Sequence, residues 1–235
     1  MAQASGDRHP HGGGHIATAG APLESATGAI IALHGRGGGA DDIIALAKQV
    51  APSAVAIVAP QASGNIWYPF RFLEPMERNE PYLSSALRRV GELIAELQEQ
   101  GIPVERIALL GFSQGACLAL ETAARNARRY AAVIGFSGGL IGPPGTRFDY
   151  DGGLHGAPVF LGCSDVDPHI PKERVEESAA ALRRLGAAVD VRIYPGMGHT
   201  INRDELDAAR AMLAKAFAPG ERDSSQARND SGGSE

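Results

Sequence analysis

The chain has 235 residues, of which 44% are hydrophobic, and a formal net charge of −5 at pH 7. This length and apolar content suffice for one domain with a sizeable core, and the negative charge argues against nucleic acid as a partner. Because no apolar signal segment opens the chain and no run of about 18 apolar residues occurs, we expect no integral membrane segment and a cytoplasmic location.

Both ends of the chain are polar. Residues 1–15 and 219–235 are rich in Gly, Ser, Asp, Arg and His, a composition typical of disordered tails, so we expect one folded domain at 16–218. The first of these segments holds three histidines, His9, His11 and His15. Their glycine-spaced setting favours a solvated tail over a metal site, and we expect no bound metal.

The apolar run 29–33 is followed at once by the glycine-rich segment 34–39, His-Gly-Arg-Gly-Gly-Gly. A loop of this kind directly after an early strand presents backbone amides that suit an oxyanion. We expect the N–H of Arg36 to be one donor of an oxyanion hole. We expect His34 to hydrogen-bond within its own loop and to shape the hole instead of transferring protons.

Residues 64–72 form a long connection that contains four of the chain's aromatic residues. Long connections between strands and helices are usually functional or partly disordered. Two interpretations of the aromatic cluster stay open. The rings either form a wall of the substrate pocket or cover the edge of the sheet as part of the core.

Amphipathic helices alternate with the apolar runs. Leucine, valine and isoleucine recur at helical spacing between Pro81 and Gly101, and the same period is found at about 171–184 and 203–217. Strands that alternate with helices are typical of βαβ units, so we predict an α/β domain with a mostly parallel sheet. Cys117 and Cys163 lie in apolar elements and are expected to stay reduced.

A candidate nucleophile lies where the run 106–110 turns into helix-forming residues through Gly111-Phe112-Ser113-Gln114-Gly115. A strand that enters a helix through a tight turn exposes the central side chain at its tip, and the flanking glycines avoid clashes there. The N–H of Gln114, beside the serine, is the second expected oxyanion donor. A second match at 135–139 leads into Leu-Ile-Gly-Pro-Pro, which cannot continue as a helix, so Ser137 is predicted to be a loop serine.

An activated serine needs a base, and the base needs an acid that fixes its tautomer. Asp165 and Asp167 follow the strand-like run 157–162, and His199 follows the run 189–194. Each lies just past the carboxyl end of a predicted strand, where open α/β sheets carry their sites. The proline after Asp167 restrains its backbone, so we expect Asp167 to orient His199 and Asp165 to be a turn residue.

Four blocks of the sequence resemble the carboxylesterase/phospholipase family of α/β-hydrolases, which includes the acyl-protein thioesterases. They are residues 34–37, 111–115, 167–171 and 194–199, and they follow the family's order within about residues 20–217. The resemblance implies an α/β-hydrolase fold, with helices on both faces of a mostly parallel sheet and no large cap domain. It also implies action on esters or thioesters of modest size. Thioesterase-type members usually carry Leu-Gly-Asp where this chain has Arg36-Gly37-Gly38.

The same blocks supply the expected substrate contacts. We expect Gly35, Gly37 and Met197 to contact the substrate, and the resemblance favours a substrate contact for Trp67 as well.

We therefore predict a serine carboxylesterase that hydrolyses small esters with short-to-medium acyl groups, as a monomer or homodimer and without a cofactor. Ser113 attacks the carbonyl carbon, His199 takes and returns the proton, and Asp167 orients His199. Two alternatives stay open. One is an acyl thioesterase or lysophospholipase, which would need a longer apolar groove. The other is a non-catalytic ligand-binding protein on the same scaffold, which would have no need for an intact nucleophile, base and acid.

Overall fold

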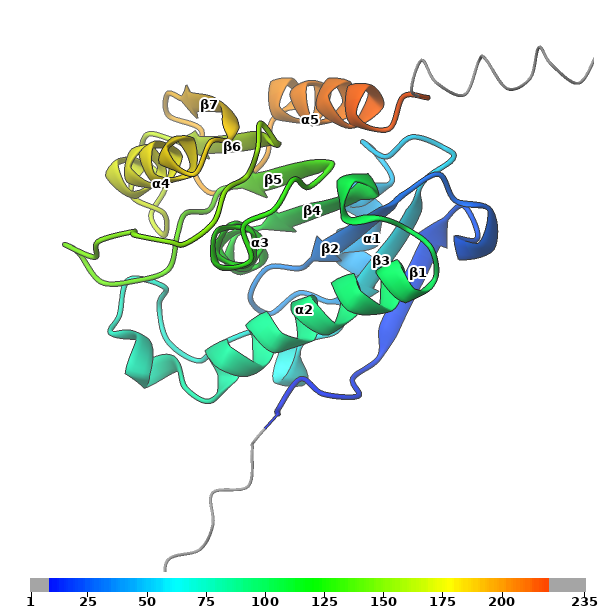
Figure 1. Cartoon of the computed structure of the whole chain (residues 1–235). Coiled ribbons are helices and arrows are strands. Elements are labelled where there is room, and N and C mark those ends of the chain that lie inside the picture. Colours follow the sequence, from blue (N-terminus) through cyan, green and yellow to red (C-terminus); the bar gives the residue numbers. More distant parts are fainter. Residues whose placement is uncertain (1–8, 220–235) are drawn as a thin grey trace, which may run out of the picture.

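A seven-stranded sheet lies at the centre of the computed structural model, which describes residues 9–219 (Figure 1). The strands are β1 (Ile16–Gly20), β2 (Ala29–Leu33), β3 (Ala56–Pro60), β4 (Ile107–Phe112), β5 (Ala132–Phe136), β6 (Pro158–Ser164) and β7 (Ala188–Tyr194). Their order in the sheet is β1-β3-β2-β4-β5-β6-β7. Strand β1 is antiparallel to β3, and all other neighbours are parallel.

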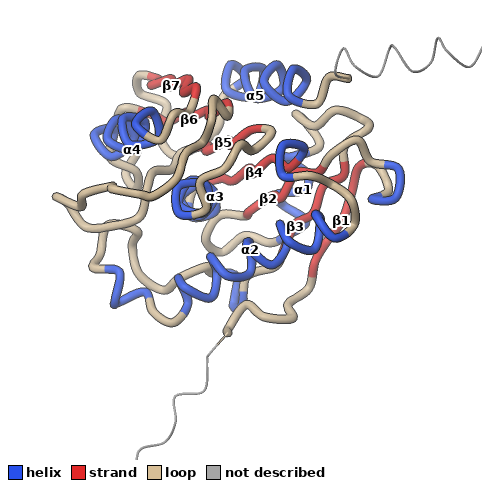
Figure 2. The backbone as a smooth tube through the Cα atoms, viewed as in Figure 1, coloured by secondary structure: helices blue, strands red, loops and turns tan. Residues whose placement is uncertain are grey.

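Helices cover both faces of the sheet (Figure 2). They are α1 (Ala40–Ala47), α2 (Tyr82–Glu99), α3 (Gln114–Arg125), α4 (Lys172–Arg184) and α5 (Arg203–Ala216). Successive residues of a strand point to opposite faces, so Ile31 and Leu109 pack with α2, α3 and α4, whereas Ile30 and Leu110 pack with α1 and α5. The central strands are buried on both faces, which explains why they read as continuous apolar runs.

This architecture confirms the predicted α/β-hydrolase fold with helices on both faces. Within residues 9–219, the chain between consecutive strands contains single helices, short 3-10 turns and loops, and no separate cap domain interrupts it. The longest connection without an α-helix is 137–157, between β5 and β6. No helix in this part of the chain combines the length and the apolar character that crossing a membrane requires.

Hydrogen bonds attach segment 9–15 to the domain, and residues 9–11 are buried or half-buried while residues 12–15 are exposed, so the expectation of a disordered tail over residues 1–15 is wrong for these seven positions. The His11 side chain is only 2% exposed. Its Nδ1 accepts the N–H of Ser63 (3.1 Å), which leaves Nε2 protonated to donate to the carbonyl of Trp67 (3.0 Å). The backbone N–H of His11 donates to the Ser85 hydroxyl at 3.0 Å.

His9 is hydrogen-bonded to helix α2, which contains Ser85. Its ring lies 2.7 Å from the Ser85 hydroxyl and 3.1 Å from the Glu92 carboxylate. His15, by contrast, is exposed. Hydrogen bonding thus holds segment 9–15 against α2 and the 63–67 loop, although its composition is polar. Residues 1–8 and 220–235 lie outside the described part of the chain, and with them the rest of the tail predictions.

Candidate active site

Ser113 lies at the turn between β4 and α3, with φ at +55° and ψ at −119°. Such a φ is rare for a residue with a side chain, and the surrounding contacts hold it in place. The Ser113 N–H donates to the Phe136 carbonyl on β5 (2.9 Å), and its carbonyl accepts the N–H of Cys117 (3.0 Å). A Cβ on Gly111 would overlap the backbone of Gly115, and one on Gly115 would overlap the carbonyl at the end of β2. The two glycines are therefore required by close packing.

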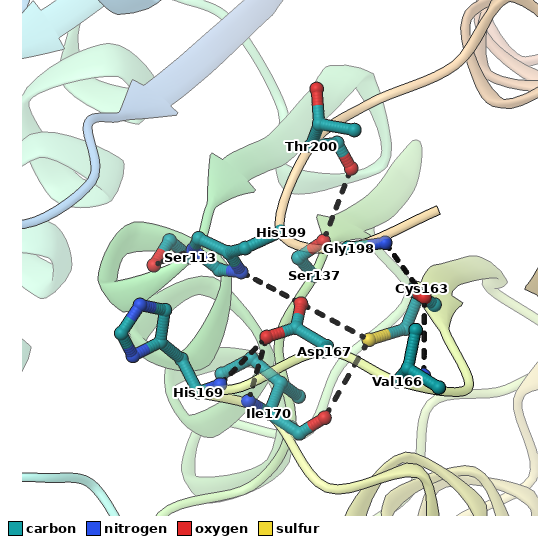
Figure 3. Close-up of polar contacts among 12 residues, drawn as sticks. Ser113, Ser137, Cys163, Val166, Asp167, His169, Ile170, Gly198, His199 and Thr200 are labelled. Atoms are coloured by element: carbon teal, nitrogen blue, oxygen red, sulfur yellow. Dashed lines mark hydrogen bonds and ion pairs between the residues drawn. The ribbon is translucent and has the colours of Figure 1, made fainter. Parts of the chain in front are cut away.

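Ser113, His199 and Asp167 form one chain of hydrogen bonds at the carboxyl edge of the sheet (Figure 3). The Nδ1 of His199 lies 2.7 Å from Oδ2 of Asp167, and its Nε2 lies 2.8 Å from the Ser113 hydroxyl. Since an ionised carboxylate can only accept, Nδ1 carries the proton. Nε2 is then free to accept the serine proton.

The Asp167 carboxylate is completely buried and is satisfied on both oxygens. Its Oδ1 accepts the N–H groups of His169 (2.8 Å) and Ile170 (3.0 Å), and its Oδ2 faces His199 (Figure 3). Burial by itself raises the pKa of Asp167. The hydrogen bonds from His199 and from the two backbone N–H groups outweigh burial, so the pKa lies below its usual range. The carboxyl group therefore stays ionised.

Asp165 points away from this chain of hydrogen bonds. Its carboxylate accepts the N–H of Gly196 at 2.8 Å, so it braces the loop that carries His199 instead of a turn within its own loop. The buried Ser164 hydroxyl does the same, because it accepts the N–H of Gly198 at 3.0 Å. The role of Ser164 has no local signal in the sequence, since it depends on β6 and β7 lying side by side.

Ser137 follows β5 with a positive φ of 49° and is fully buried. Its hydroxyl lies 3.4 Å from the carbonyl of Thr200 (Figure 3). The ring of His199 is hydrogen-bonded to Ser113 instead, in agreement with the prediction that Ser137 is a loop serine.

The glycine-rich loop after β2 lies directly against Ser113. A Cβ built on Gly35 would be 3.5 Å from the Ser113 Cβ. His34 accepts the N–H of Ala62 at Nε2 (3.1 Å), so its Nδ1 is protonated and donates to the Gly35 carbonyl (2.8 Å). Burial lowers the pKa of His34, which favours this neutral form.

The Arg36 side chain attaches this loop to the aromatic segment. Its guanidinium donates to three successive carbonyl oxygens, those of Tyr68 (2.9 Å), Pro69 (2.9 Å) and Phe70 (2.7 Å). The Gln114 side chain holds the same segment from the other side. Its Oε1 accepts the N–H of Trp67 and its Nε2 donates to the carbonyl of Tyr68, both at 2.8 Å. Residues 67–70 are thus fixed by two side chains from the expected oxyanion positions.

A cleft of about 520 Å³ opens beside Ser113. The residues that line it are Gly35, Arg36, Tyr68, Pro69, Phe70, Arg71, Phe72, Glu74, Arg78, Phe112, Ser113, Gln114, Cys117, His169, Ile170 and His199. The aromatic segment does form one wall of this cleft, through Tyr68, Phe70 and Phe72.

Three of the expected substrate-contacting residues are not part of this lining. Trp67 is fully buried, its indole N–H donates to the carbonyl of His34 (2.9 Å), and its ring packs near the rings of His11 and His34. The expected substrate contact of Trp67 is therefore corrected to a core position. The sulfur of Met197 accepts a bond from Asn202 (3.1 Å), and the N–H of Gly37 is bound to the Asn65 carbonyl (2.8 Å). Only Gly35 of the expected contacts lies in the wall of the cleft.

Two rings of the cleft pack on the imidazole ring of His199. The Phe112 ring lies 5.1 Å from that of His199, and the His169 ring meets it edge-on at 4.8 Å. These contacts limit the orientation of the imidazole. Phe112 and His169 lie within the blocks 111–115 and 167–171, close to the predicted nucleophile and acid, whereas Arg71 and Arg78 belong to no motif that would have identified them in the sequence.

The two cysteines are free and buried, in agreement with their predicted reduced state. Burial raises the pKa of both thiols to about 12, so neither offers a thiolate nucleophile at neutral pH. Across residues 9–219, no group of three or more His, Cys, Asp or Glu side chains is arranged to hold a metal ion.

Residues 15–217 match the protein family described as Phospholipase/Carboxylesterase. Among solved structures, a phospholipase/carboxylesterase from Dyadobacter fermentans is similar with 46% identity and a TM-score of 0.84, over 88% of this chain and 99% of that chain. The esterase PE8 is similar with 27% identity and a TM-score of 0.69, over 85% of this chain and 97% of that chain.

Acyl-protein thioesterase 1 of Gibberella zeae is 35% identical over 130 residues, which cover 54% of this chain and 55% of that protein. The match thus spans about half the length of this curated relative.

Proposed function

The chain belongs to the phospholipase/carboxylesterase family, and we propose that it is a serine carboxylesterase that acts through an acyl-enzyme intermediate. One observation carries this proposal. The hydrogen-bonded chain from Asp167 through His199 to Ser113 ends at an open cleft, with the base in the tautomer that can accept the serine proton.

In the first half of the reaction, the Ser113 oxygen attacks the ester carbonyl carbon while Nε2 of His199 takes the hydroxyl proton. The resulting imidazolium is stabilised by the buried, ionised Asp167. Collapse of the tetrahedral intermediate breaks the bond to the alcohol oxygen, and His199 returns the proton to that oxygen. Water then repeats the sequence on the acyl-enzyme and releases the acid.

We assign the negative oxygen of the intermediate to the N–H groups of Gln114 and Arg36. Gln114 is the first residue of α3, where N–H groups have no partner within the helix. In the glycine-rich loop, the N–H groups of Gly37, Gly38 and Gly39 already bond to Asn65, Gly35 and Asp42. Arg36 lines the cleft together with Ser113, and its N–H has no such bond within the described part of the chain, so we assign this N–H to the oxyanion.

The test is labelling by a fluorophosphonate probe together with turnover of aryl esters. Only a base-activated serine beside an oxyanion hole attacks phosphorus readily, so wild-type protein should be labelled and Ser113→Ala should lose both labelling and turnover. Ser137→Ala is the matched control and should retain both. Labelling that survives Ser113→Ala but disappears in Ser137→Ala would overturn the assignment of the nucleophile. Full turnover in Ser113→Ala would overturn the mechanism.

A second candidate function is acyl thioester hydrolysis, since the Gibberella zeae relative is named as an acyl-protein thioesterase and the same acyl-enzyme chemistry serves both bonds. Ester and thioester substrates with the same acyl group, compared from acetyl to palmitoyl, separate the two candidates. Higher kcat/KM for short aryl esters supports the carboxylesterase, whereas higher kcat/KM for long-chain thioesters supports the thioesterase.

A non-catalytic binding protein is the remaining alternative. Absence of labelling and of turnover for every ester and thioester, in protein shown to be folded by circular dichroism, would support it.

A further inference from the structure

The cleft beside Ser113 is lined by three arginines, although the whole chain carries a formal net charge of −5. They are Arg36, Arg71 and Arg78, and the only acidic side chain in the lining is Glu74. The cleft therefore has an excess of positive charge, which attracts anionic ligands.

Two of the three guanidinium groups already have partners. Arg36 donates to the carbonyl oxygens of residues 68–70. Arg78 forms an ion pair with Glu74 at 2.7 Å and lies over the Phe70 ring at 4.2 Å. Both arginines thus stabilise the wall of the cleft through these contacts.

Arg71 differs from them because its side chain is exposed and has no carboxylate partner among residues 9–219. Its one side-chain hydrogen bond, to the carbonyl of His169, is long at 3.4 Å. That contact places the guanidinium next to the residue whose ring packs on His199. Arg71 is thus an unneutralised cation close to the catalytic base.

The backbone that carries Arg71 is firmly held. The fully buried Asn79 side chain accepts the N–H of Phe70 (2.8 Å) and donates to the carbonyl of Arg71 (3.2 Å). Because the backbone is fixed, binding a ligand has to order only the side chain of Arg71 and not the loop that carries it. The planar guanidinium matches the geometry of a carboxylate, to which it can donate two parallel hydrogen bonds.

We propose that the preferred substrate is an ester that also carries a carboxylate, and that Arg71 binds this carboxylate. The inference rests on the proposed esterase function and narrows its substrate class to anionic esters. Arg71 acts as a specificity-determining residue that has no part in the bond-breaking steps.

The test compares two pairs of esters that differ in charge. Phenyl hydrogen glutarate and phenyl valerate have acyl chains of equal length, and only the first has a carboxylate on the acyl side. The 4-carboxyphenyl and phenyl esters of butyric acid place the charge on the leaving group. We expect wild-type protein to favour the anionic member of at least one pair by about tenfold or more in kcat/KM, the scale of a hydrogen bond to a charged group.

Arg71→Gln should remove this preference and leave the neutral esters within about threefold of wild type, and Arg71→Lys should restore part of it. Arg129→Gln is the matched control, because it removes the same charge from an exposed arginine just before β5, at the opposite edge of the sheet. The preference should also weaken with added salt. Equal kcat/KM within both pairs for wild type, or an equal effect of Arg71→Gln and Arg129→Gln, would overturn the inference.

Binding to Ser113→Ala, measured by calorimetry, separates the inference from the esterase proposal because it needs no turnover. Tighter binding of phenyl hydrogen glutarate or 4-carboxyphenyl butyrate than of its neutral partner, lost when Arg71→Gln is added, would support the inference even if no ester is hydrolysed. Hydrolysis of neutral esters that depends on Ser113, with no charge preference in turnover or binding, would overturn the inference and leave the esterase proposal standing.

Discussion

At the scale of single residues, the two aspartates of the β6–α4 loop differ in burial and in the groups that their carboxylates reach. Asp167 meets His199 and two backbone N–H groups of its own loop, whereas Asp165 meets the N–H of Gly196. The carboxylates lie two positions apart in the sequence, yet their proposed roles are different. One fixes the tautomer of the base, and the other holds the loop that carries the base.

We predict that Asp167→Asn keeps the fold but lowers kcat for aryl esters by up to about 10⁴. The amide oxygen can still accept the N–H groups of His169 and Ile170, so the loop stays in place. The amide NH₂ facing His199 would favour the tautomer with the proton on Nε2, which cannot accept the proton of Ser113.

Asp165→Asn is the control for this prediction. Its amide oxygen can still accept the N–H of Gly196, so kcat should stay within about tenfold of wild type. Circular dichroism and ester turnover check both variants. A large loss in Asp165→Asn and a small one in Asp167→Asn would show that the acid is assigned to the wrong residue.

Ser113, Asp167 and His199 could be predicted from the sequence because each lies in or next to a local sequence pattern. The strand–turn–helix pattern identifies Ser113, and the strand ends identify Asp167 and His199, because each signal lies within a few residues of the side chain concerned. Their hydrogen bonding matches the expected arrangement, and their catalytic roles stay predictions. The cleft wall is not predictable in this way. Trp67 and Tyr68 are neighbours and both are buried, yet only Tyr68 also lines the cleft, and this difference depends on the path of the loop between β3 and α2.

At the scale of elements, the glycine-rich loop and the aromatic segment behave as one unit because Arg36 joins them. Three carbonyl oxygens on one guanidinium fix the direction of the loop whose N–H is proposed to serve the oxyanion. The arginine at this position is also where the sequence departs from the Leu-Gly-Asp of thioesterase-type members.

Replacing Arg36 by methionine should lower kcat for neutral and anionic esters alike, by about tenfold to a hundredfold, since a misplaced donor stabilises the transition state poorly. Arg36→Lys should retain part of the activity because the ammonium group can still donate to these carbonyls. Steady-state kinetics on phenyl valerate measures the effect. Unchanged kcat in Arg36→Met would mean that the loop holds its position without the side chain.

The start of helix α5 contains the buried Glu205, which forms a reciprocal capping pair with Asn202. Burial raises the pKa of Glu205 to about 7, and its Oε1 has no hydrogen-bond partner in the described part of the chain. The carboxyl group of the unfolded chain ionises near its ordinary pKa of about 4.3. Between these two values the folded state therefore holds a proton that the unfolded state has lost.

Because the buried carboxyl group of Glu205 resists ionisation in the folded state, its contribution to the free energy of unfolding should fall as pH rises from about 4.5 to 7. The loss should amount to roughly 3 kcal/mol at most. Glu205→Gln has no such proton, so its stability relative to wild type should increase over the same interval and level off above it. Urea unfolding of both proteins at pH 5 and pH 8 measures this change, and all shared titrations cancel in the difference. An identical difference at the two pH values would contradict the raised pKa.

Elements with a strong pattern could be predicted from the sequence, and those without one could not. The run 29–33 coincides with β2, and the periodic segments at 171–184 and 203–217 correspond to α4 and α5. Strand β1 has a weaker signal. It is a half-exposed edge strand with the sequence Ile-Ala-Thr-Ala-Gly, and only its antiparallel pairing with the buried strand β3 defines it.

At the scale of the whole molecule, a polar N-terminal segment is part of the fold. Composition alone favours disorder for such a sequence because it lacks apolar side chains to bury. Segment 9–15 is held by hydrogen bonds to residues more than 50 positions away, and no local pattern could reveal these partners. His11 is its anchor, since its ring also contacts the rings of Trp67 and Tyr82.

We predict that His11→Ala lowers the free energy of unfolding by about 2 to 4 kcal/mol, because it leaves the buried carbonyl of Trp67 and the N–H of Ser63 without their partner and opens a cavity beside the indole ring. For a domain of this size, this corresponds to a melting temperature lower by roughly 5 to 15 °C. His15→Ala removes an exposed imidazole of the same segment and should leave the melting temperature within about 1 °C of wild type.

Because Trp67 also donates to Gln114 and His34, the loss of His11 should reach the cleft and lower ester turnover moderately, at a temperature where the variant is still folded. Thermal unfolding followed by circular dichroism, with turnover measured on the same samples, checks both effects. Equal melting temperatures for His11→Ala and His15→Ala would mean that segment 9–15 contributes nothing to the stability of the domain.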